Sequence, residues 1–507
     1  MCITAGSEPK GPAGGSPAHK KPGFPVPTGG SNRPGRWARG LVKMLHKGGS
    51  MEANFEEALR KCPADYAEIR WEAVERSRVA FQRDQLLTLE RSREAGGVVR
   101  ALVDGAWGLA VFTAPDQIGE KLKEAAGLAR AAARRVRDPI RLAEVPPVQD
   151  KFLPALENDF REIPLEEKRK LVEGYNKLIL NHSPKIVSSS VRYTDSIRHV
   201  YYANTEGTYL EQRIPDVTVL LLAVAREDGD VQQAFETVGE AGGYELALGL
   251  EEKAEAVARR AVELLSAKPV QGGKYTVVLD QELAGVFIHE AFGHICEADF
   301  LLKNEPMRKV MQLGKRFGVE ALNVVEDGFI PGRRGNAPYD DEGVPRRKIH
   351  LIKEGVLAGL MHSRATAAKT GMAPTGNARA VSWEHEPIVR MRNTCIEPGE
   401  ASFEELLKGI DYGIYAKGAF GGQTEFEQFT FSAQYAYEIK GGELGEMLRD
   451  VVLTGNVFDT LRNIEQLGSD FQLKGGAGGC GKGGQSPLPV TDGAPHVRIR
   501  DVIIGGR

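Results

Sequence analysis

The stretch from Val277 to His294 constrains this chain more than any other part of its sequence. It reads VVLDQELAGVFIHEAFGH, which predicts a short buried strand followed by an amphipathic helix that ends on two histidines around a glutamate. Histidine is the commonest neutral metal ligand, and a neighbouring carboxylate can act as a general base. The stretch therefore predicts a helix that contributes to a metal site.

The spacing of the two histidines differs from the familiar zinc-peptidase pattern H-E-x-x-H. His289 and His294 are five residues apart, which is about 140° around a regular helix with 3.6 residues per turn. A regular helix would therefore point them in different directions. Gly293 directly precedes the second histidine, and glycine readily leaves helical geometry. We expect the helix to break at Gly293, so that His294 returns to the metal.

Glu290 continues the apolar stripe of the predicted helix. At 100° per residue, its direction lies within about 60° of the directions of Leu283 and Phe287. A carboxylate that points into a protein is costly unless it is paired or lies near a metal. This position favours Glu290 as a catalytic base at a metal centre. The alternative is a pair of structural histidines beside a buried, hydrogen-bonded glutamate.

Two histidines make an incomplete site, because catalytic zinc usually has three protein ligands and one open position. Cys480 is the best candidate for the third ligand, since the glycines around it allow close approach to a buried centre. The alternatives are a flexible glycine loop with an incidental thiol, or ligation by Cys296, two residues after His294. Glu297 and Asp299 are close enough in the sequence to be ligands or partners of the ligands.

The overall composition is that of a globular protein with two or three domains. The chain has 507 residues, of which 41% are hydrophobic and 27% charged, and its net charge is −3. This charge gives no support for direct binding of nucleic acid, and no apolar run is long enough to predict a membrane span. Five scattered cysteines indicate a reducing compartment, so we expect a cytoplasmic protein.

The order of strand and helix patterns predicts an α+β protein. Residues 1–50 are rich in Gly, Pro, Ser and Lys, and we expect a disordered leader there. Residues 51–268 mix helix and strand patterns and predict an N-terminal α/β-mixed domain. Residues 269–507 predict a β-rich C-terminal domain that carries one metal-binding helix. Within it, Asn456 is expected to cap a helix that ends at Gly468.

Four segments in a fixed order carry a specific resemblance. They are His289–His294 with the acidic residues just after it, Asp340–Pro345, Thr375–Arg379 and Cys480–Gln485. Together they resemble the TldD/PmbA family of metallopeptidases, some of which have been described as modulators of DNA gyrase. The resemblance extends from about Met51 to the C-terminus, which makes residues 269–507 the metallopeptidase domain.

The resemblance implies a zinc-dependent peptidase that cleaves peptides or unfolded polypeptides. It implies one Zn²⁺ per catalytic subunit, held by His289, His294 and Cys480, with Glu290 as the catalytic base. Because the histidine motif is retained, the chain resembles the catalytic TldD branch. The family also implies a dimer, often with a non-catalytic paralogue. Phe292 stands where family members often have a small residue, so substrate preference is not carried over.

Two other functions fit the sequence. The chain could be a non-enzymatic regulator that binds a protein partner acting on DNA, or a metal-dependent hydrolase of a non-peptide amide. A regulator would contain no metal and would cleave no peptide, even when mixed with its paralogue. Zinc content and peptide cleavage therefore distinguish these functions.

Overall fold

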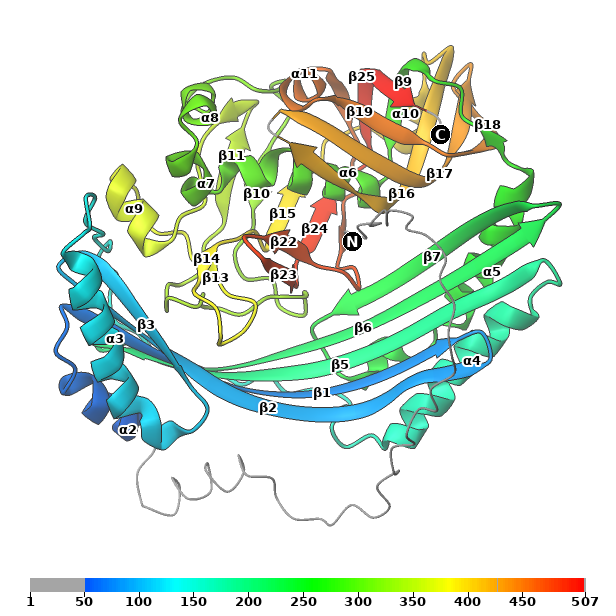
Figure 1. Ribbon diagram of the computed structural model, residues 1–507. Coiled ribbons are helices and arrows are strands. Elements are labelled where there is room, and N and C mark those ends of the chain that lie inside the picture. The colour runs from blue at the N-terminus through cyan, green and yellow to red at the C-terminus, as the bar shows by residue number, and fades with distance from the viewer. Residues whose placement is uncertain (1–50, 426, 506–507) are drawn as a thin grey trace, which may run out of the picture.

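The computed structural model describes residues 51–425 and 427–505, and it confirms the predicted α+β class (Figure 1). The expected leader at residues 1–50 lies outside the described residues. A curved sheet of long strands from the first half of the chain lies beneath the sheets of the second half (Figure 1). No helix in the described part of the chain is long and apolar enough to cross a lipid bilayer.

The N-terminal sheet has seven strands in the order β3-β2-β1-β5-β6-β4, and β7 also pairs with β6. Its pairs are antiparallel except for β4 and β6, which are parallel. Asp104 and Gly105 form the turn between β2 and β3, and both have the positive φ typical of a tight hairpin. The strands are β1 (Tyr66–Gln82), β2 (Gln85–Val103), β3 (Ala106–Phe112), β4 (Gln149–Phe152), β5 (Ile186–Asn204), β6 (Tyr209–Glu227) and β7 (Asp230–Glu240).

The two faces of this sheet differ because side chains alternate along each strand. Odd-numbered residues such as Ile69, Tyr193 and Val219 are buried in apolar clusters between the sheet and the helices that cover it. Even-numbered residues such as Arg70 and Arg198 are polar and meet the C-terminal half. The covering helices are α2 (Met51–Arg60), α3 (Ile118–Ala133), α4 (Leu165–Asn181) and α5 (Glu251–Ser266), with 3-10 turns η1 (Pro115–Gln117) and η2 (Tyr244–Ala247).

The second half contains an eight-stranded sheet in the order β16-β9-β25-β19-β17-β18-β8, with β20 paired to β25. Its long strands bury alternating aromatic residues in the main C-terminal core. The strands are β8 (Lys268–Pro269), β9 (Gly273–Leu279), β16 (Tyr412–Glu425), β17 (Gln428–Lys440), β18 (Glu443–Arg449), β19 (Val452–Asn456), β20 (Ile464–Leu467) and β25 (Val497–Gly505).

A six-stranded sheet in the order β12-β11-β10-β15-β24-β21 and two small hairpins complete this half. The six strands are β10 (Val324–Glu326), β11 (Ile349–Lys353), β12 (Val356–Leu357), β15 (Asn393–Ile396), β21 (Gln472–Lys474) and β24 (Thr491–Ala494). The hairpins are β13 (Ala378–Arg379) with β14 (Ile388–Val389), and β22 (Cys480–Lys482) with β23 (Gln485–Leu488). In Figure 1, β22 and β23 lie between the body of the C-terminal half and the large sheet.

Helix α6 (Gln281–Ile288) follows β9 as the sequence predicts, and it contacts both larger C-terminal sheets. The Asp280 side chain caps it by accepting a hydrogen bond from the backbone N–H of Leu283, 2.9 Å away. Four shorter helices also belong to this half: α7 (Ala298–Lys303), α8 (Glu305–Val310), α9 (Arg364–Thr370) and α10 (Phe403–Leu407). The predicted metal-binding helix is therefore held at the centre of the C-terminal core.

The helix expected from Asn456 to Gly468 is shorter than predicted. Asn456 caps α11 (Val457–Arg462), but the helix ends at Arg462. The next apolar residues form β20, where Ile464 pairs with Ile499 of β25. The apolar spacing in this segment fits both a helix and a strand, and pairing with β25 decides in favour of the strand.

Candidate metal centre

The two histidines of the motif lie on a π-helical turn that continues α6. This turn, η3 (His289–Gly293), has the backbone N–H of His294 donating to the carbonyl of His289, five residues earlier. The 3-10 turn η4 (His294–Cys296) follows directly. Because a π turn is wider than an α turn, residues five apart return to the same side. The two imidazole centroids are 5.3 Å apart.

The prediction that the helix breaks at Gly293 is wrong. Gly293 keeps right-handed helical angles, with φ −57° and ψ −51°. A Cβ atom at this position would lie 2.1 Å from the Sδ atom of Met391, whose side chain is fully buried. The position thus leaves no room for a side chain. The wider hydrogen-bond spacing of η3 returns His294 to the side of His289.

His289, His294 and Cys480 form one cluster, in which the possible ligand atoms all lie within 4.8 Å of one another. The Sγ atom of Cys480 is 3.3 Å from Nε2 of His294. His289 and Cys480 are buried, whereas His294 is half-buried. Cys296 is buried in the apolar core and is outside this cluster. The structure therefore brings together the three residues that the sequence singled out as metal ligands.

A carboxylate orients each histidine through Nδ1. Asp492 Oδ1 lies 2.8 Å from Nδ1 of His289, and Glu297 Oε2 lies 3.0 Å from Nδ1 of His294. Metal-binding histidines commonly donate their second ring N–H to such a carboxylate, which fixes the tautomer and the ring orientation. In each ring this leaves Nε2 as the nitrogen for a metal.

The charges around Cys480 favour its thiolate form. Burial alone would raise the pKa of this thiol, but His289 and His294 lower it to about 5. Burial likewise opposes the charged form of His294, yet the Glu297 carboxylate and Cys480 together raise the pKa of His294 to about 10. The thiolate is the form of cysteine that binds metals, and a metal ion can replace the protons of the two imidazoles. The donor set therefore fits a divalent metal ion.

Glu290 lies beside the cluster, with its Oε2 3.7 Å from Nε2 of His294. Its side chain is 27% exposed, so it borders both the cluster and the solvent. Burial raises the pKa of Glu290, and the two histidines partly oppose this shift. A carboxyl group with a raised pKa at the edge of a metal cluster suits proton transfer to and from a reacting water.

Lys482 forms ion pairs with both acidic residues that follow the motif. Its Nζ lies 3.0 Å from Oε2 of Glu297 and 2.7 Å from Oδ1 of Asp299. It also donates to the carbonyl of Val389 at 2.7 Å. Glu297 thus lies between His294 and Lys482. Glu297 is therefore a direct partner of His294, whereas Asp299 contacts Lys482.

Two further residues of the centre were missed from the sequence. Asp492 precedes Gly493, and an Asp-Gly pair is typical of a turn, yet it lies in β24 beside β15. Arg390 is fully buried and donates to the carbonyl of Cys480 at 2.7 Å and to that of Gln485 at 3.2 Å. Asp492 reaches the centre through strand pairing and Arg390 through its side-chain hydrogen bonds, so the local sequence carries no signal for either role.

The other two segments of the resemblance lie outside the cluster. Asp341 forms an ion pair with Arg198 of β5 at 3.0 Å, and Glu342 forms one with Arg100 of β2 at 3.3 Å. Asn377 donates to Glu326 of β10 at 3.1 Å. The segment Asp340–Pro345 therefore joins the two halves of the chain, and Thr375–Arg379 supports the six-stranded sheet.

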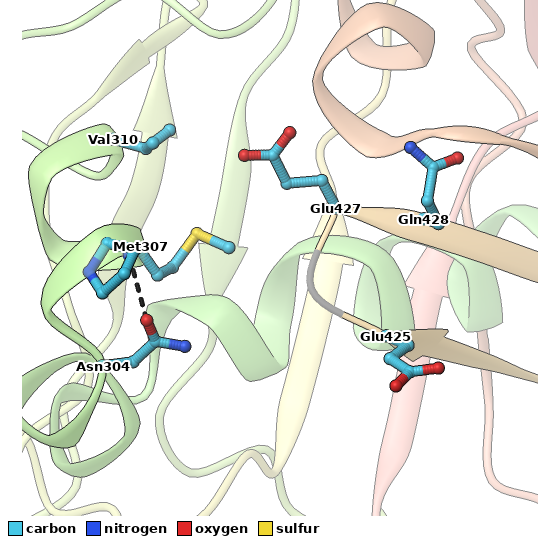
Figure 2. A pocket seen from close by; sticks show the side chains of 7 residues that line it. Asn304, Met307, Val310, Glu425, Glu427 and Gln428 are labelled. Atoms are coloured by element: carbon cyan, nitrogen blue, oxygen red, sulfur yellow. Dashed lines mark hydrogen bonds between the residues drawn. The ribbon is translucent and has the colours of Figure 1, made fainter.

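A separate cavity of about 450 Å³ lies between α8 and the neighbouring ends of β16 and β17 (Figure 2). None of its lining residues belongs to the cluster of His289, His294 and Cys480. Figure 2 shows Met307 and Val310 on one side and the Glu427 carboxylate on the other. Its lining residues are Asn304, Pro306, Met307, Val310, Glu425, Glu427 and Gln428.

Three family models match consecutive parts of the chain. Residues 67–133 match domain 1 of the PmbA/TldA metallopeptidases, residues 158–268 the central domain, and residues 272–506 the C-terminal domain. The chain is 45% identical to metalloprotease slr0863 of Synechocystis over 445 residues, covering 87% of this chain and 95% of that protein. It is 31% identical over 447 residues to the zinc metalloprotease TldD homolog of Saccharolobus solfataricus, covering 87% and 97%.

Two solved structures share the fold. TldE from Thermococcus kodakarensis superposes with a TM-score of 0.72 at 20% identity, covering 90% of this chain and 100% of that one. A Thermotoga maritima protein, described as a candidate modulator of a DNA gyrase, gives a TM-score of 0.72 at 21% identity, covering 92% and 99%. At these identities the likeness shows the fold alone.

Proposed function

The chain belongs to the PmbA/TldA metallopeptidase family, and we propose that it is a zinc-dependent peptidase of the catalytic TldD branch that cleaves peptides or unfolded polypeptides. The observation that carries this proposal is the cluster of His289, His294 and Cys480 with Glu290 at its edge. Zinc is supported by the donor set and by the name of the Saccharolobus solfataricus relative. The domains proposed are residues 51–268 and a metallopeptidase domain at 269–507.

In this proposal His289, His294 and Cys480 hold the zinc ion. Three protein ligands leave one position open, as in catalytic rather than structural zinc sites. When bound, zinc would supply Lewis acidity toward a peptide carbonyl and an attacking water. Asp492 and Glu297 hold the two imidazoles in the orientation that leaves Nε2 for the metal.

Glu290 acts as the base. It takes a proton from the attacking water and later returns a proton to the leaving amine, as general acid–base catalysis requires. Its raised pKa and its partly exposed carboxylate support this role, because the group must both reach water and exchange a proton. The proposed substrates are peptides and unfolded polypeptides.

Substitution Glu290→Gln tests the proposal because it keeps the shape of the side chain and removes the base. We expect kcat for an unstructured peptide to fall about 10²- to 10⁴-fold, while the zinc content stays at the wild-type level. Glu425→Gln, on the wall of the separate cavity, is the matched control and should keep full activity. Wild-type cleavage rates in Glu290→Gln would exclude this residue as the base.

A second candidate function is a partner-binding regulator, which the description of the Thermotoga maritima structure favours. Such a protein would purify without metal and would cleave no peptide, even when mixed with its paralogue. The fold shared with TldE supports a related proposal, that this chain pairs with a non-catalytic paralogue in a dimer. Mixing the two purified chains and measuring the mass of the complex tests that pairing.

A further inference from the structure

The loop that carries Cys480 is held by the N-terminal sheet, and we propose that Asp216 and Arg334 are positioning residues that keep this loop at the metal cluster. The proposal rests on the proposed role of Cys480 as a zinc ligand. It goes further because it makes metal binding depend on a strand of the other half of the chain. The loop consists of residues 475–479, between β21 and Cys480.

Arg334 connects the loop to the N-terminal sheet. Its Nη1 donates to the carbonyl of Gly476 at 2.6 Å and also to the carbonyl of Gly478. Its Nε and Nη2 donate to the two carboxylate oxygens of Asp216 in β6, at 2.7 and 3.1 Å. The Arg334 side chain is only 7% exposed. One buried guanidinium thus binds a carboxylate of one half and two loop carbonyls of the other.

The sheet also contacts the loop backbone directly. A Cβ atom on Gly239 of β7 would lie 2.4 Å from the carbonyl oxygen of Gly476. A Cβ atom on Gly475 would lie 2.1 Å from the carbonyl oxygen of Gly239. The two backbones approach so closely that glycine is needed on both sides. Strand β7 of the N-terminal sheet therefore packs directly against the backbone of the loop.

Lys474, at the start of the loop, makes a second connection. Its Nζ lies 2.9 Å from Oε1 of Glu236 in β7 and 2.5 Å from Oε2 of Glu282 in α6. It thereby links the N-terminal sheet, the loop and the helix that carries His289. The loop is tied at its start by Lys474 and along its length by Arg334.

The composition of the loop explains why these contacts matter. Four of its five residues are glycine, which loses more conformational freedom on ordering than any other residue. A loop that delivered Cys480 only part of the time would lower the apparent metal affinity by that fraction. A bidentate arginine–carboxylate pair fixes both position and direction. The Asp216–Arg334 pair therefore holds the loop in the position that places Cys480 beside the two histidines.

The test compares zinc affinity in wild type, Asp216→Asn, Arg334→Gln and the double variant, by competition with a chromophoric chelator. We expect each single variant to bind zinc about 10- to 100-fold more weakly, the range typical of residues that support metal ligands. The double variant should be no weaker than Arg334→Gln, because the two residues act as a unit. With cobalt in place of zinc, the thiolate-to-metal absorption should weaken in all three.

Arg333→Gln is the matched control. Arg333 pairs with Glu240 of β7 at 2.5 Å, so it joins the same two halves of the chain without contacting a loop carbonyl in the described structure. We expect it to bind zinc like wild type. An equal loss in Arg333→Gln would mean that any weakening of the contact between the halves lowers affinity, and would overturn the proposal. Unchanged affinity and cobalt spectra in both Asp216→Asn and Arg334→Gln would also overturn it.

Failure of the proposed function has a different signature. If wild-type protein binds cobalt without thiolate absorption, Cys480 is not a ligand, and the reason for holding the loop is lost with it. If wild type shows this absorption and the variants retain it in full, only the positioning role fails. Thermal unfolding of the zinc-free variants shows that each one is folded before its affinity is compared.

Discussion

The metal cluster joins two regions that position their ligands in different ways. His289 and His294 lie on a continuous helix packed between two sheets, so their geometry is set within one segment. Cys480 follows a glycine loop, and its position is set by Arg334 and Arg390 from distant parts of the chain. The helix therefore provides a preformed half-site. The loop makes completion of the site depend on tertiary contacts.

Removing a ligand from either region should have the largest effect. We expect His289→Ala and Cys480→Ala to abolish peptide cleavage. Their loss of zinc affinity should exceed the loss typical of supporting residues, which is about 10- to 100-fold. Metal analysis after dialysis against a chelator measures the loss of zinc. Zinc content like that of wild type in Cys480→Ala would exclude Cys480 as the third ligand.

The supporting carboxylates should give the next largest effect, and they test the helical region alone. Asp492→Asn removes the charge that orients His289 while keeping a similar shape. We expect about 10- to 100-fold weaker zinc binding, measured by chelator competition. Glu305→Gln, on the exposed surface of α8, should bind zinc like wild type. If both variants bind equally well, the imidazole of His289 needs no carboxylate to stay in place.

A methyl group at Gly293 should test whether packing, rather than helix breaking, explains this glycine. Gly293→Ala places a Cβ against the sulfur of Met391, so we expect the free energy of unfolding to fall by about 1–3 kcal/mol. Gly174→Ala in α4 is the control, because a Cβ there meets nothing within 4 Å and alanine favours helix. Chemical denaturation measures both.

The double variant Gly293→Ala with Met391→Ala completes this comparison. Removing the sulfur makes room for the new methyl group, so the combined loss should be smaller than the sum of the two single losses. Strictly additive losses would mean that the two side chains do not compete for the same space. A Gly293→Ala variant as stable as Gly174→Ala would contradict the packing explanation.

The sequence predicted what depends on local periodicity. The strand, the helix and the order of His289, Glu290 and His294 all follow from residues close together in the chain, and the α+β class follows from the same patterns. The π turn was not predicted, because the packing against Met391 that accompanies it involves residues about 100 positions away. The glycines around Cys480 suggested a close approach, but nothing local identifies Asp216 as the residue that anchors their loop.

His362 should affect the pH dependence of stability only at acidic pH, and it lies next to a residue that bonds the end of the motif helix without itself being a ligand. It follows Met361, whose N–H donates to the carbonyl of Cys296 at the end of the motif helix, 2.9 Å away. His362 is 1% exposed, and burial lowers its pKa to about 4. The folded state therefore favours the neutral ring. Its contribution to stability is complete above pH 6.5 and is lost as the pH falls toward 4.

Comparing wild type with His362→Gln isolates this contribution. Between pH 7.5 and pH 5 we expect wild type to lose about 2 kcal/mol of unfolding free energy that the variant does not lose, since each unit of pKa shift corresponds to about 1.4 kcal/mol. Both proteins are measured without metal, so protonation of the ligand histidines affects them equally. Parallel pH profiles would mean that the pKa of His362 is the same in the folded and the unfolded chain, which would contradict the effect of burial.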